Sequence, residues 1–265
     1  QAKGRLFDQS RVAVLNYDDP AGRAYAQSAP CPTFTYSEGH DEADLTARDL
    51  RLRPDGLDFV AVTRHEIARV SLPIPGSFSL YNALCALSCG LALGLSLKQC
   101  AAALTGAPGV RGRMEVVPHA GPGTVVIDYA HTPDALEKAL LSLRTFTPGR
   151  LLCLFGCGGD RDRGKRPIMG AIAATLSDGC ILTSDNPRSE DPGAIIKEIL
   201  AGIEEPPDTL LVEPDRVAAI GAALALLREG DTLLLAGKGH ETYQEVKGEK
   251  RPMDEREIVA KWEKV

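Results

Sequence analysis

The second half of the sequence alternates short apolar runs with amphipathic segments, and no other feature limits the fold as strongly. Between the runs, apolar residues recur every three or four positions, as in Leu136, Leu140 and Leu143. This spacing is typical of a helix that covers one face of a sheet. Continuous apolar strands that alternate with such helices predict an α/β fold, in which helices cover both faces of a parallel sheet. The predicted strands are Thr124–Asp128, Leu151–Phe155, 180–183, 210–212 and Thr232–Ala236.

The first 111 residues have a more mixed pattern, which separates them from the rest of the chain. Two strand-like runs flank the turn Arg64-His65-Glu66 and predict a β-hairpin. Ser96 is placed to cap a short helix that would end near Gly106. The glycine-rich stretch 106–113 predicts a linker or hinge. We therefore expect two domains, residues 1–111 and residues 112–265. Further predicted elements are a strand at 11–15, the hairpin strands at 57–63 and Ile67–Leu72, and a helix at 79–93.

The composition argues against several classes of function. The formal net charge is −6, so the chain lacks the basic surface typical of nucleic-acid binding, and we expect no nucleic-acid partner. No apolar run reaches the roughly 18 residues of a membrane span, so no membrane insertion is expected. The seven cysteines contain no C-x-x-C pair, and we interpret them as thiols in a reducing cytoplasm. The sequence begins without Met inside an apparent helix, and we expect it to be part of a longer protein.

Polar loops follow the predicted strands, at the end of a parallel sheet where ligands bind. After the first strand, Asp128 and His131 are candidates for the mouth of a nucleotide site. After the second strand, the glycine-rich residues 156–167 open toward a helix, which favours anions. They match neither G-x-G-x-x-G nor G-x-x-x-x-G-K-[ST], which argues against a dinucleotide fingerprint and a P-loop here. A solvated surface is the alternative for their basic residues, Arg161, Arg163, Lys165 and Arg166.

The loops after the third and fifth strands combine a guanidinium group with carboxylates. Arg188 offers a planar fork that can pair with a carboxylate. Asp185 and Asn186 can accept hydrogen bonds from an ammonium group. In the last loop, Gly237 lets a ligand approach the backbone closely, and Glu241 can accept from an amine. Together the loops predict a site for an amino-acid zwitterion beside phosphates, although each loop taken alone also fits an ordinary turn.

Further motifs extend along the whole chain in a fixed order. They are Ala2-Lys3-x-x-Leu6-Phe7, Asn16-x-Asp18-Asp19-Pro20, Tyr81-Asn82-Ala83, Gly112-Arg113-Met114-Glu115, and the loops at 128–133, 156–167, 185–188 and 237–241. In this set the sequence resembles the Mur ligase family of peptidoglycan synthesis. The resemblance implies that residues 1–111 end a central ATPase domain and that residues 112–265 form a Rossmann-like C-terminal domain with a mostly parallel sheet. It also implies a longer enzyme, because the family's G-T-x-G-K-[ST] loop and UDP-binding domain are absent from this sequence.

The resemblance implies roles for individual residues. Lys3 matches a lysine that becomes a carbamate, whose oxygens suit Mg²⁺. Asn82, Arg113 and Asp128 match residues near ATP, and His131 lies beside them. Lys3, Asp128 and His131 are accordingly the expected catalytic residues. The residues expected to contact the incoming amino acid are Arg161, Asp185, Asn186, Pro187, Arg188, Gly237 and Glu241.

The implied reaction is the ATP-dependent addition of meso-diaminopimelate to UDP-MurNAc-L-Ala-D-Glu through an acyl phosphate. Family members that add L-lysine usually lack the arginine of this loop. The resemblance therefore implies that Arg188 favours diaminopimelate, whose distal carboxylate the guanidinium can pair with. Three alternatives stay open at this point: an L-lysine-adding member of the family, a ligase like folylpolyglutamate synthase, and a non-catalytic amino-acid-binding module. A nicotinamide oxidoreductase is disfavoured, because the glycine fingerprint is missing.

Overall fold

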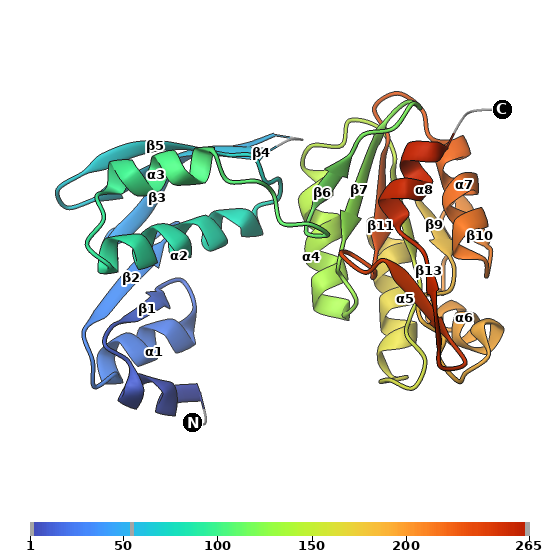
Figure 1. Ribbon diagram of the computed structural model, residues 1–265, viewed down its shortest axis with the longest axis horizontal. Coiled ribbons are helices and arrows are strands. Elements are labelled where there is room, and N and C mark those ends of the chain that lie inside the picture. Colours follow the sequence, from blue (N-terminus) through green and yellow to red (C-terminus); the bar gives the residue numbers. More distant parts are fainter. Residues whose placement is uncertain (1–2, 54–55, 263–265) are drawn as a thin grey trace. The chain divides into compact units, whose positions relative to one another are not determined.

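The computed structural model describes residues 3–53 and 56–262, with the backbone alone for Lys3. The chain divides into two compact units, Gln1–Pro108 and Gly109–Val265 (Figure 1). Each unit has its own sheet and its own hydrophobic cluster. The expected domain boundary after residue 111 stays a prediction.

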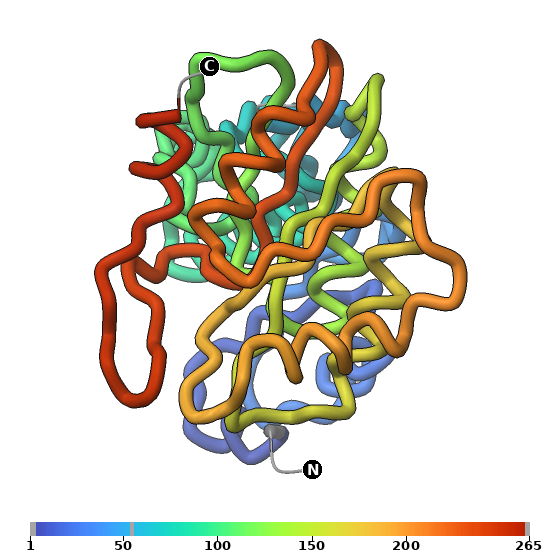
Figure 2. Tube along the Cα trace, turned by 90° about the vertical axis from the view of Figure 1, so that its right-hand side faces the viewer, coloured from blue at the N-terminus to red at the C-terminus, as the bar shows by residue number. Residues whose placement is uncertain are grey.

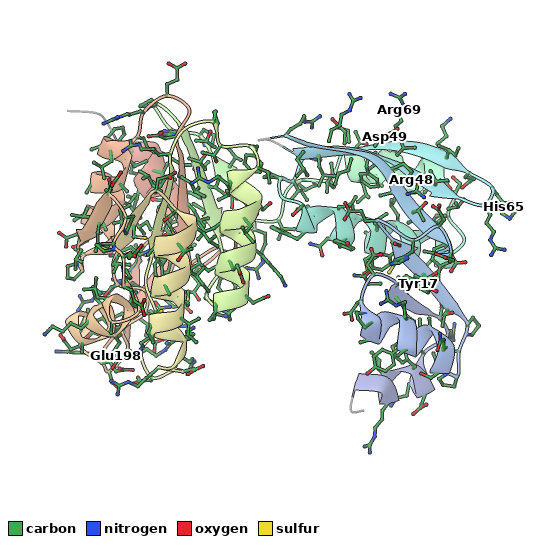
Figure 3. The ribbon with its side chains drawn as sticks, turned by 180° about the vertical axis from the view of Figure 1, so that it is seen from behind. Tyr17, Arg48, Asp49, His65, Arg69 and Glu198 are labelled. Atoms are coloured by element: carbon green, nitrogen blue, oxygen red, sulfur yellow. The ribbon has the colours of Figure 1, made fainter. Side chains whose placement is uncertain are left out.

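The first unit is built on a five-stranded sheet in the order β1-β2-β3-β4-β5. The first three strands pair in parallel, and β4 and β5 continue the sheet antiparallel. The predicted hairpin is therefore confirmed, and Figure 3 shows His65 at its turn. The sequence does not predict β3, because its charged residues and a bulge between Arg48 and Arg51 obscure the two-residue alternation. The strands are β1 (Ala13–Asn16), β2 (Thr33–Ser37), β3 (Leu45–Arg53), β4 (Gly56–Thr63) and β5 (Ile67–Leu72).

Helices complete the core of the first unit. Helix α2 matches the predicted helix and buries Leu80, Leu84 and Leu87 completely. Helix α3 begins with a capping box at Ser96 and ends before Gly106, as predicted. The helical segments are η1 (Lys3–Gln9), α1 (Pro20–Ser28), α2 (Phe78–Ala92) and α3 (Leu97–Thr105).

The second unit contains a six-stranded sheet in the order β10-β9-β8-β11-β7-β6. Strands β7 to β11 pair in parallel, which confirms the predicted parallel sheet. Strand β6 joins the β7 edge antiparallel; the sequence does not predict it, because three residues are too few to show a periodicity. The strands are β6 (Glu115–Val117), β7 (Thr124–Asp128), β8 (Leu151–Phe155), β9 (Gly179–Leu182), β10 (Thr209–Val212) and β11 (Thr232–Ala236).

Helices cover both faces of this sheet, as the alternation predicts. Helices α4, α5 and α6 pack side by side, whereas α7 packs against α8. Through α4, α5 and α6 the chain moves from β7 to β8, β9 and β10, toward one edge of the sheet. Through α7 it returns to β11, between β8 and β7. Because such crossovers are right-handed, the return places α7 on the opposite face. The helices are α4 (Pro133–Arg144), α5 (Lys165–Leu176), α6 (Pro192–Leu200), α7 (Arg216–Leu226) and α8 (Glu255–Lys261).

The position of β11 between β8 and β7 decides which loops meet. Strands β9, β8, β11 and β7 are parallel neighbours, so their carboxyl ends share one edge of the sheet. The loop after β11 therefore leaves the sheet between the glycine-rich loop after β8 and the loop after β7. Thr132 caps α4 and Asp191 caps α6, which fixes where two of these loops end.

A hairpin outside the main sheet reaches one of these loops. Strands β12 (Tyr243–Val246) and β13 (Glu249–Pro252) pair antiparallel, and Figure 2 shows them as a red loop that projects from the unit. A parallel bridge between Arg188 and Val246 joins β12 to the loop after β9. In the part of the chain that the structure describes, we find no helix with the length and apolar character that a bilayer crossing needs.

Candidate functional site

The loop Asp185-Asn186-Pro187-Arg188 follows β9 and is fixed by the hairpin. The N–H of Arg188 donates to the carbonyl of Glu245 at 3.1 Å, and the N–H of Lys247 donates to the carbonyl of Arg188 at 2.7 Å. Arg188 has a φ of 50°, in the left-handed region, which costs a non-glycine residue roughly 1–2 kcal/mol. The hairpin therefore holds a strained residue in place at the end of the sheet.

The glycine-rich loop after β8 packs directly on this loop. A Cβ atom on Gly159 would lie 2.0 Å from the carbonyl oxygen of Pro187, and one on Gly156 would lie 2.2 Å from that of Thr183. Only glycine permits this approach of the two backbones. The Nη1 atom of Arg188 donates to the Gly159 carbonyl at 2.8 Å, so the guanidinium lies beside the glycine-rich loop.

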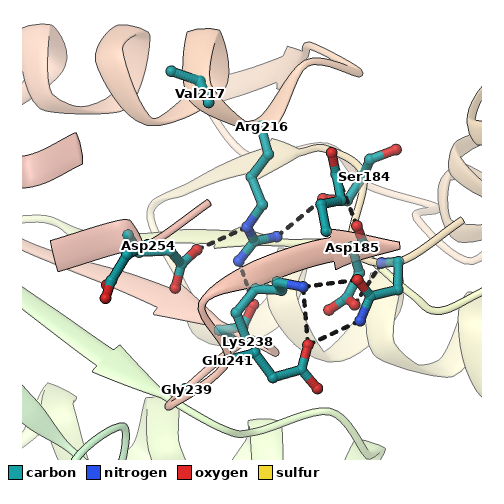
Figure 4. Close-up of polar contacts among 12 residues, drawn as sticks. Ser184, Asp185, Arg216, Val217, Lys238, Gly239, Glu241 and Asp254 are labelled. Carbon is teal, nitrogen blue, oxygen red and sulfur yellow. Dashed lines mark hydrogen bonds and ion pairs between the residues drawn. The ribbon is translucent and has the colours of Figure 1, made fainter. Parts of the chain in front are cut away.

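Lys238 joins the loops after β9 and β11 and is completely buried (Figure 4). Its Nζ atom donates to Oδ1 of Asn186 at 2.8 Å and to Oε2 of Glu241 at 2.9 Å. Asn186 Nδ2 also donates to Glu241 Oε2, at 2.9 Å. Oδ1 of Asn186 accepts from Lys238 and also from the N–H of Glu245. The contact of Asn186 with the incoming amino acid stays a prediction.

Two carboxylates in the site keep an oxygen without a hydrogen-bond partner among the described residues. Both side-chain bonds to Glu241 end on Oε2, which leaves Oε1. In Asp185, Oδ1 accepts from the N–H of Asn186 at 2.6 Å. Its Oδ2 lies 2.7 Å from where a Cβ of Gly237 would stand, so a side chain at Gly237 would block it. These oxygens can accept from an ammonium group.

Glu241 stays ionised in this environment. Burial alone would raise the pKa of its carboxyl group. Hydrogen bonds from Lys238 and Asn186, together with the field of Lys238 and His240, outweigh burial and lower the pKa. The site therefore holds a negative charge that a bound cation can meet.

The same site offers a guanidinium to an anion. Nη1 of Arg188 is bound to Gly159, and Nε lies 3.4 Å from Oε2 of Glu245. Nη2 has no hydrogen-bond partner among residues 3–53 and 56–262, so part of the fork is available. A guanidinium beside carboxylate oxygens complements the two charges of an amino acid.

Arg166 supports the glycine-rich loop with a guanidinium that is completely buried. It binds both carboxylate oxygens of Glu190 at 2.9 and 2.8 Å, Glu198 at 2.7 Å and the carbonyl of Gly158 at 3.1 Å. These bonds lower the pKa of Glu190 to about 2. A solvated surface is therefore the wrong interpretation of Arg166, whereas Arg163 is exposed, as that alternative requires.

Arg161 lies at the exposed rim of the glycine-rich loop. Its Nη1 donates to the carbonyl of Asp160 at 3.2 Å. Its Cγ and the Nη1 of Arg188 both lie near the position that a Cβ of Gly158 would take, at 3.8 and 3.0 Å. Arg161 thus borders the same loop as Arg188, and its contact with the amino acid stays a prediction.

A second cluster of expected residues surrounds Tyr129 after β7. The guanidinium carbon of Arg113 lies 4.5 Å from the Tyr129 ring centroid, and the ring of His131 lies at 4.6 Å. Asp128 is buried and accepts from the N–H of Met114 at 2.8 Å. Burial raises the pKa of Asp128, although backbone hydrogen bonds and Arg113 oppose the rise. A cation and a hydrogen-bond acceptor so placed suit the phosphates and ribose of a nucleotide.

The two clusters adjoin each other. A Cβ on Gly112 would lie 2.2 Å from the carbonyl carbon of Gly239, and the rings of Tyr129 and His240 are 5.1 Å apart. Gly112 belongs to the stretch that we expect to be a linker, yet it is buried against the loop after β11. The end of that stretch is therefore a packed part of the second unit.

The remaining expected residues belong to the first unit. Asn82 is exposed on α2. Lys3 begins η1, and its side chain lies outside the described residues. Among the residues that the structure describes, no three His, Cys, Asp or Glu side chains are grouped to hold a metal ion. The ATP contact of Asn82 and the Mg²⁺ contact of Lys3 stay predictions.

Arg216 ties together the strand ends from which the site loops leave (Figure 4). Its guanidinium is completely buried and pairs with Glu255 of α8 at 2.7 Å, which is also buried. It donates to the carbonyls of Ser184 and Ala236 at 3.3 and 2.9 Å. The sequence gives no signal for this pair, because its partners are far apart in the chain.

Sequence reasoning also missed the roles of Lys238 and Glu245. Lys238 belongs to the motif at 237–241. Its place between two glycines, directly after a buried strand, was the sequence signal that could have identified it. Glu245 carries no such signal, because its position beside Arg188 depends on the hairpin.

Two family models match the chain. The Mur ligase middle domain matches residues 1–90, and the Mur ligase, glutamate ligase domain matches residues 112–239.

Curated relatives match over nearly the whole chain. The UDP-N-acetylmuramoyl-L-alanyl-D-glutamate–2,6-diaminopimelate ligase of Thermosynechococcus vestitus is 47% identical over 264 residues, which is 97% of this chain and 52% of the relative. The enzyme of the same name from Clostridioides difficile is 40% identical over 264 residues, 98% of this chain and 54% of the relative. The chain thus spans about half the length of the curated relatives it matches.

Solved structures agree with this fold. A structure of a UDP-N-acetylmuramoyl-L-alanyl-D-glutamate–2,6-diaminopimelate ligase has a TM-score of 0.67 at 36% identity and covers 97% of this chain and 54% of that chain. Folylpolyglutamate synthase from Thermotoga maritima has a TM-score of 0.61 at 20% identity, covering 81% of this chain and 47% of that chain. The second likeness concerns the fold alone.

Proposed function

We propose that this chain, which belongs to the Mur ligase family, is the diaminopimelate-binding part of a ligase of peptidoglycan synthesis. The complete reaction would be the ATP-dependent addition of meso-diaminopimelate to UDP-MurNAc-L-Ala-D-Glu. The observation that carries the proposal is the pairing, in one site, of the Arg188 guanidinium with the free carboxylate oxygens of Asp185 and Glu241. Relatives named for diaminopimelate at 40% and 47% identity support it.

The proposed chemistry has two steps. The D-Glu side-chain carboxylate attacks the γ-phosphorus of ATP, ADP leaves, and an acyl phosphate forms. An uncharged amine of diaminopimelate then attacks the acyl carbon, phosphate leaves, and the nitrogen loses a proton as the amide forms. Diaminopimelate has two amino-acid centres. Arg188, Asp185 and Glu241 would hold one centre, which orients the amine of the other for attack.

We further propose nucleotide contacts for individual residues, by their match to the family motifs. Arg113 would bind a phosphate, Asp128 would accept from a ribose hydroxyl, and His131 would lie beside them. Asn82 would contact the adenine, and Lys3 as a carbamate would hold Mg²⁺. Family membership and the grouping of three of these residues around Tyr129 support this part of the proposal.

No observation favours the alternatives. With its amino-acid centre placed for attack, L-lysine has no carboxylate at its far end and would leave the guanidinium of Arg188 without a partner. The likeness to folylpolyglutamate synthase is a likeness of fold at 20% identity. A non-catalytic binding module would use the same site without the reaction. The proposed location is the cytoplasm, which the seven free cysteines support.

Substitution of Arg188 tests the proposal in a ligation assay with a protein that carries this chain. Arg188→Ala should raise the diaminopimelate KM by roughly tenfold or more, because a charge-assisted hydrogen bond to a ligand carboxylate is lost. Arg188→Lys should restore only part of the affinity, because an ammonium group cannot form the planar fork. Arg251→Ala is the matched control, since Arg251 is exposed on the same hairpin. An unchanged KM in both Arg188 variants would refute the assignment.

A further inference from the structure

Lys238 is the only lysine that is completely buried among the described residues, and its ammonium group lies inside the proposed amino-acid site. We infer that Lys238 is a positioning residue: it acts as an internal counter-ion that aims Glu241 and Asn186 so that the site recognises an ammonium group. The inference deepens the proposed function and rests on it. Lys238 itself would not touch the reacting atoms.

The contacts of Lys238 form a closed triangle. Its Nζ lies 2.8 Å from Asn186 Oδ1 and 2.9 Å from Glu241 Oε2, and Asn186 Nδ2 lies 2.9 Å from the same Glu241 oxygen. Three groups that each bind the other two cannot rotate separately. The loops after β9 and β11 are therefore locked to each other at the level of their side chains.

Lys238 also determines which way the amide of Asn186 points. An ammonium group only donates, so the atom of Asn186 that faces it must be the oxygen. The backbone N–H of Glu245 donates to the same oxygen at 2.9 Å. The amide nitrogen then faces Glu241 and donates to Oε2, the oxygen that also accepts from Lys238.

This arrangement leaves one oxygen of Glu241 for the ligand. Two donors on Oε2 fix the rotation of the carboxylate, and Oε1 has no hydrogen-bond partner in the described residues. A buried ammonium without a counter-charge would be strongly unfavourable, and Glu241 supplies that charge. The Tyr243 ring, 5.3 Å from Nζ, completes the enclosure.

The groups around Glu241 come from its own loop, from the loop after β9 and from the hairpin. Lys238 and His240 belong to its own loop and favour its charged form. Tyr243 of the hairpin contributes its ring, and Asn186 contributes its amide. Lys238 is the only cation among them that bonds directly to Glu241, so no neighbour can replace it.

The test compares two ligands that differ in their ammonium groups. Diaminopimelate carries two ammonium groups and pimelate carries none, while both have the same two carboxylates. Calorimetric titration of this chain gives a dissociation constant for each ligand. The dissociation constant of pimelate divided by that of diaminopimelate measures how strongly the site recognises ammonium groups. In the unaltered chain, pimelate should bind much more weakly than diaminopimelate.

In Lys238→Met the ratio should shrink by about tenfold or more, because a misaligned carboxylate forfeits a charged hydrogen bond to the ligand. Lys250→Met is the matched control and should keep the ratio. Lys250 also contacts the Tyr243 ring, at 4.3 Å, but it lies on exposed β13 and has no bond to Glu241. If Lys238→Met does not fold, as judged by circular dichroism, Lys238→Gln takes its place.

The outcomes separate the inference from the proposed function. If the unaltered chain does not bind diaminopimelate, the proposed function fails. If it binds diaminopimelate and a folded Lys238 variant keeps the full ratio, the positioning role of Lys238 is wrong. A general loss of affinity for both ligands, with the ratio unchanged, would likewise contradict the inference and indicate a purely structural lysine.

Discussion

At the scale of single residues, the site depends on charged side chains that the fold has buried. Arg166, Arg216 and Lys238 are all completely buried, and each binds a carboxylate together with oxygens of a site loop. Burying a charge is unfavourable unless it is paired and hydrogen-bonded. Such groups therefore fix the loops that pair with them.

Arg166 provides the clearest stability prediction at this scale. Arg166→Met should destabilise the second unit, because Glu190, Glu198 and the Gly158 carbonyl lose a shared partner. Arg163→Met is the control, since Arg163 is exposed and pairs with the same Glu198. Thermal unfolding at pH 7 should show a fall of several degrees in the Tm for the first variant and little change for the second.

The stability that Arg166 contributes through Glu190 should depend on pH. The pKa of Glu190 falls from 4.5 to about 2 in the folded protein. A lowered carboxyl pKa contributes stability above the unfolded value and loses it as the pH falls through the folded value. The Tm difference between the original chain and Arg166→Met should therefore narrow between pH 4.5 and pH 2. A difference that stays constant over this window would contradict the account.

The sequence identified Asp185, Arg188 and Glu241 from their chemistry, and the structure brings them to one site. The sequence could not reveal that Oδ1 of Asn186 accepts hydrogen bonds within the protein, because its donors Lys238 and Glu245 come from other segments of the chain. Burial of an arginine is similarly invisible in a local pattern. Arg166 sits in a basic cluster that also fits a solvated surface.

At the scale of elements, the glycine-rich loop is a spacer that lets two loops touch. Gly159→Ala should push the loop against the Pro187 carbonyl, which lies only 2.0 Å from the new Cβ atom. Such overpacking typically lowers the free energy of unfolding by about 1–3 kcal/mol. It should also weaken diaminopimelate binding. The measurements are the free energy of unfolding in urea and a calorimetric titration.

Gly221→Ala is the matched control for this prediction. Gly221 lies within α7, and a Cβ atom there would meet nothing within 4 Å. Alanine should stabilise the helix by up to about 1 kcal/mol and leave binding unchanged. Equal effects at both positions would show that the loop contact is not specific.

The predictability of the elements follows from how they are buried. Strands β8 and β11 are buried along their whole length, and β7 is buried after its first residue, so continuous apolar runs mark them in the sequence. Strand β13 is exposed throughout, and β6 has three residues, so neither leaves a pattern. Those elements are held by pairing with their neighbours, which a single sequence does not display.

At the scale of the whole molecule, strand order is the part that sequence reasoning could not supply. Strand β11 comes last of the parallel strands in the chain, yet it lies between β8 and β7. This insertion places the loop with Lys238 and Glu241 between the glycine-rich loop and the Asp128 loop. From there the side chain of Lys238 reaches Asn186 in the loop after β9. The strand-end rule predicts where a ligand binds, and the order of strands determines which side chains meet at that edge.

A calorimetric titration of this chain with meso-diaminopimelate and with L-lysine tests directly whether Arg188 selects the ligand. We predict that diaminopimelate binds at least about tenfold more tightly than L-lysine. When one centre is placed for attack, the far end of diaminopimelate still offers a carboxylate to Arg188, whereas the far end of L-lysine is only an ammonium group. We also predict that this preference disappears in Arg188→Ala. Equal binding of the two ligands by the original chain, or a preference that survives in Arg188→Ala, would contradict the role of Arg188 in selecting diaminopimelate.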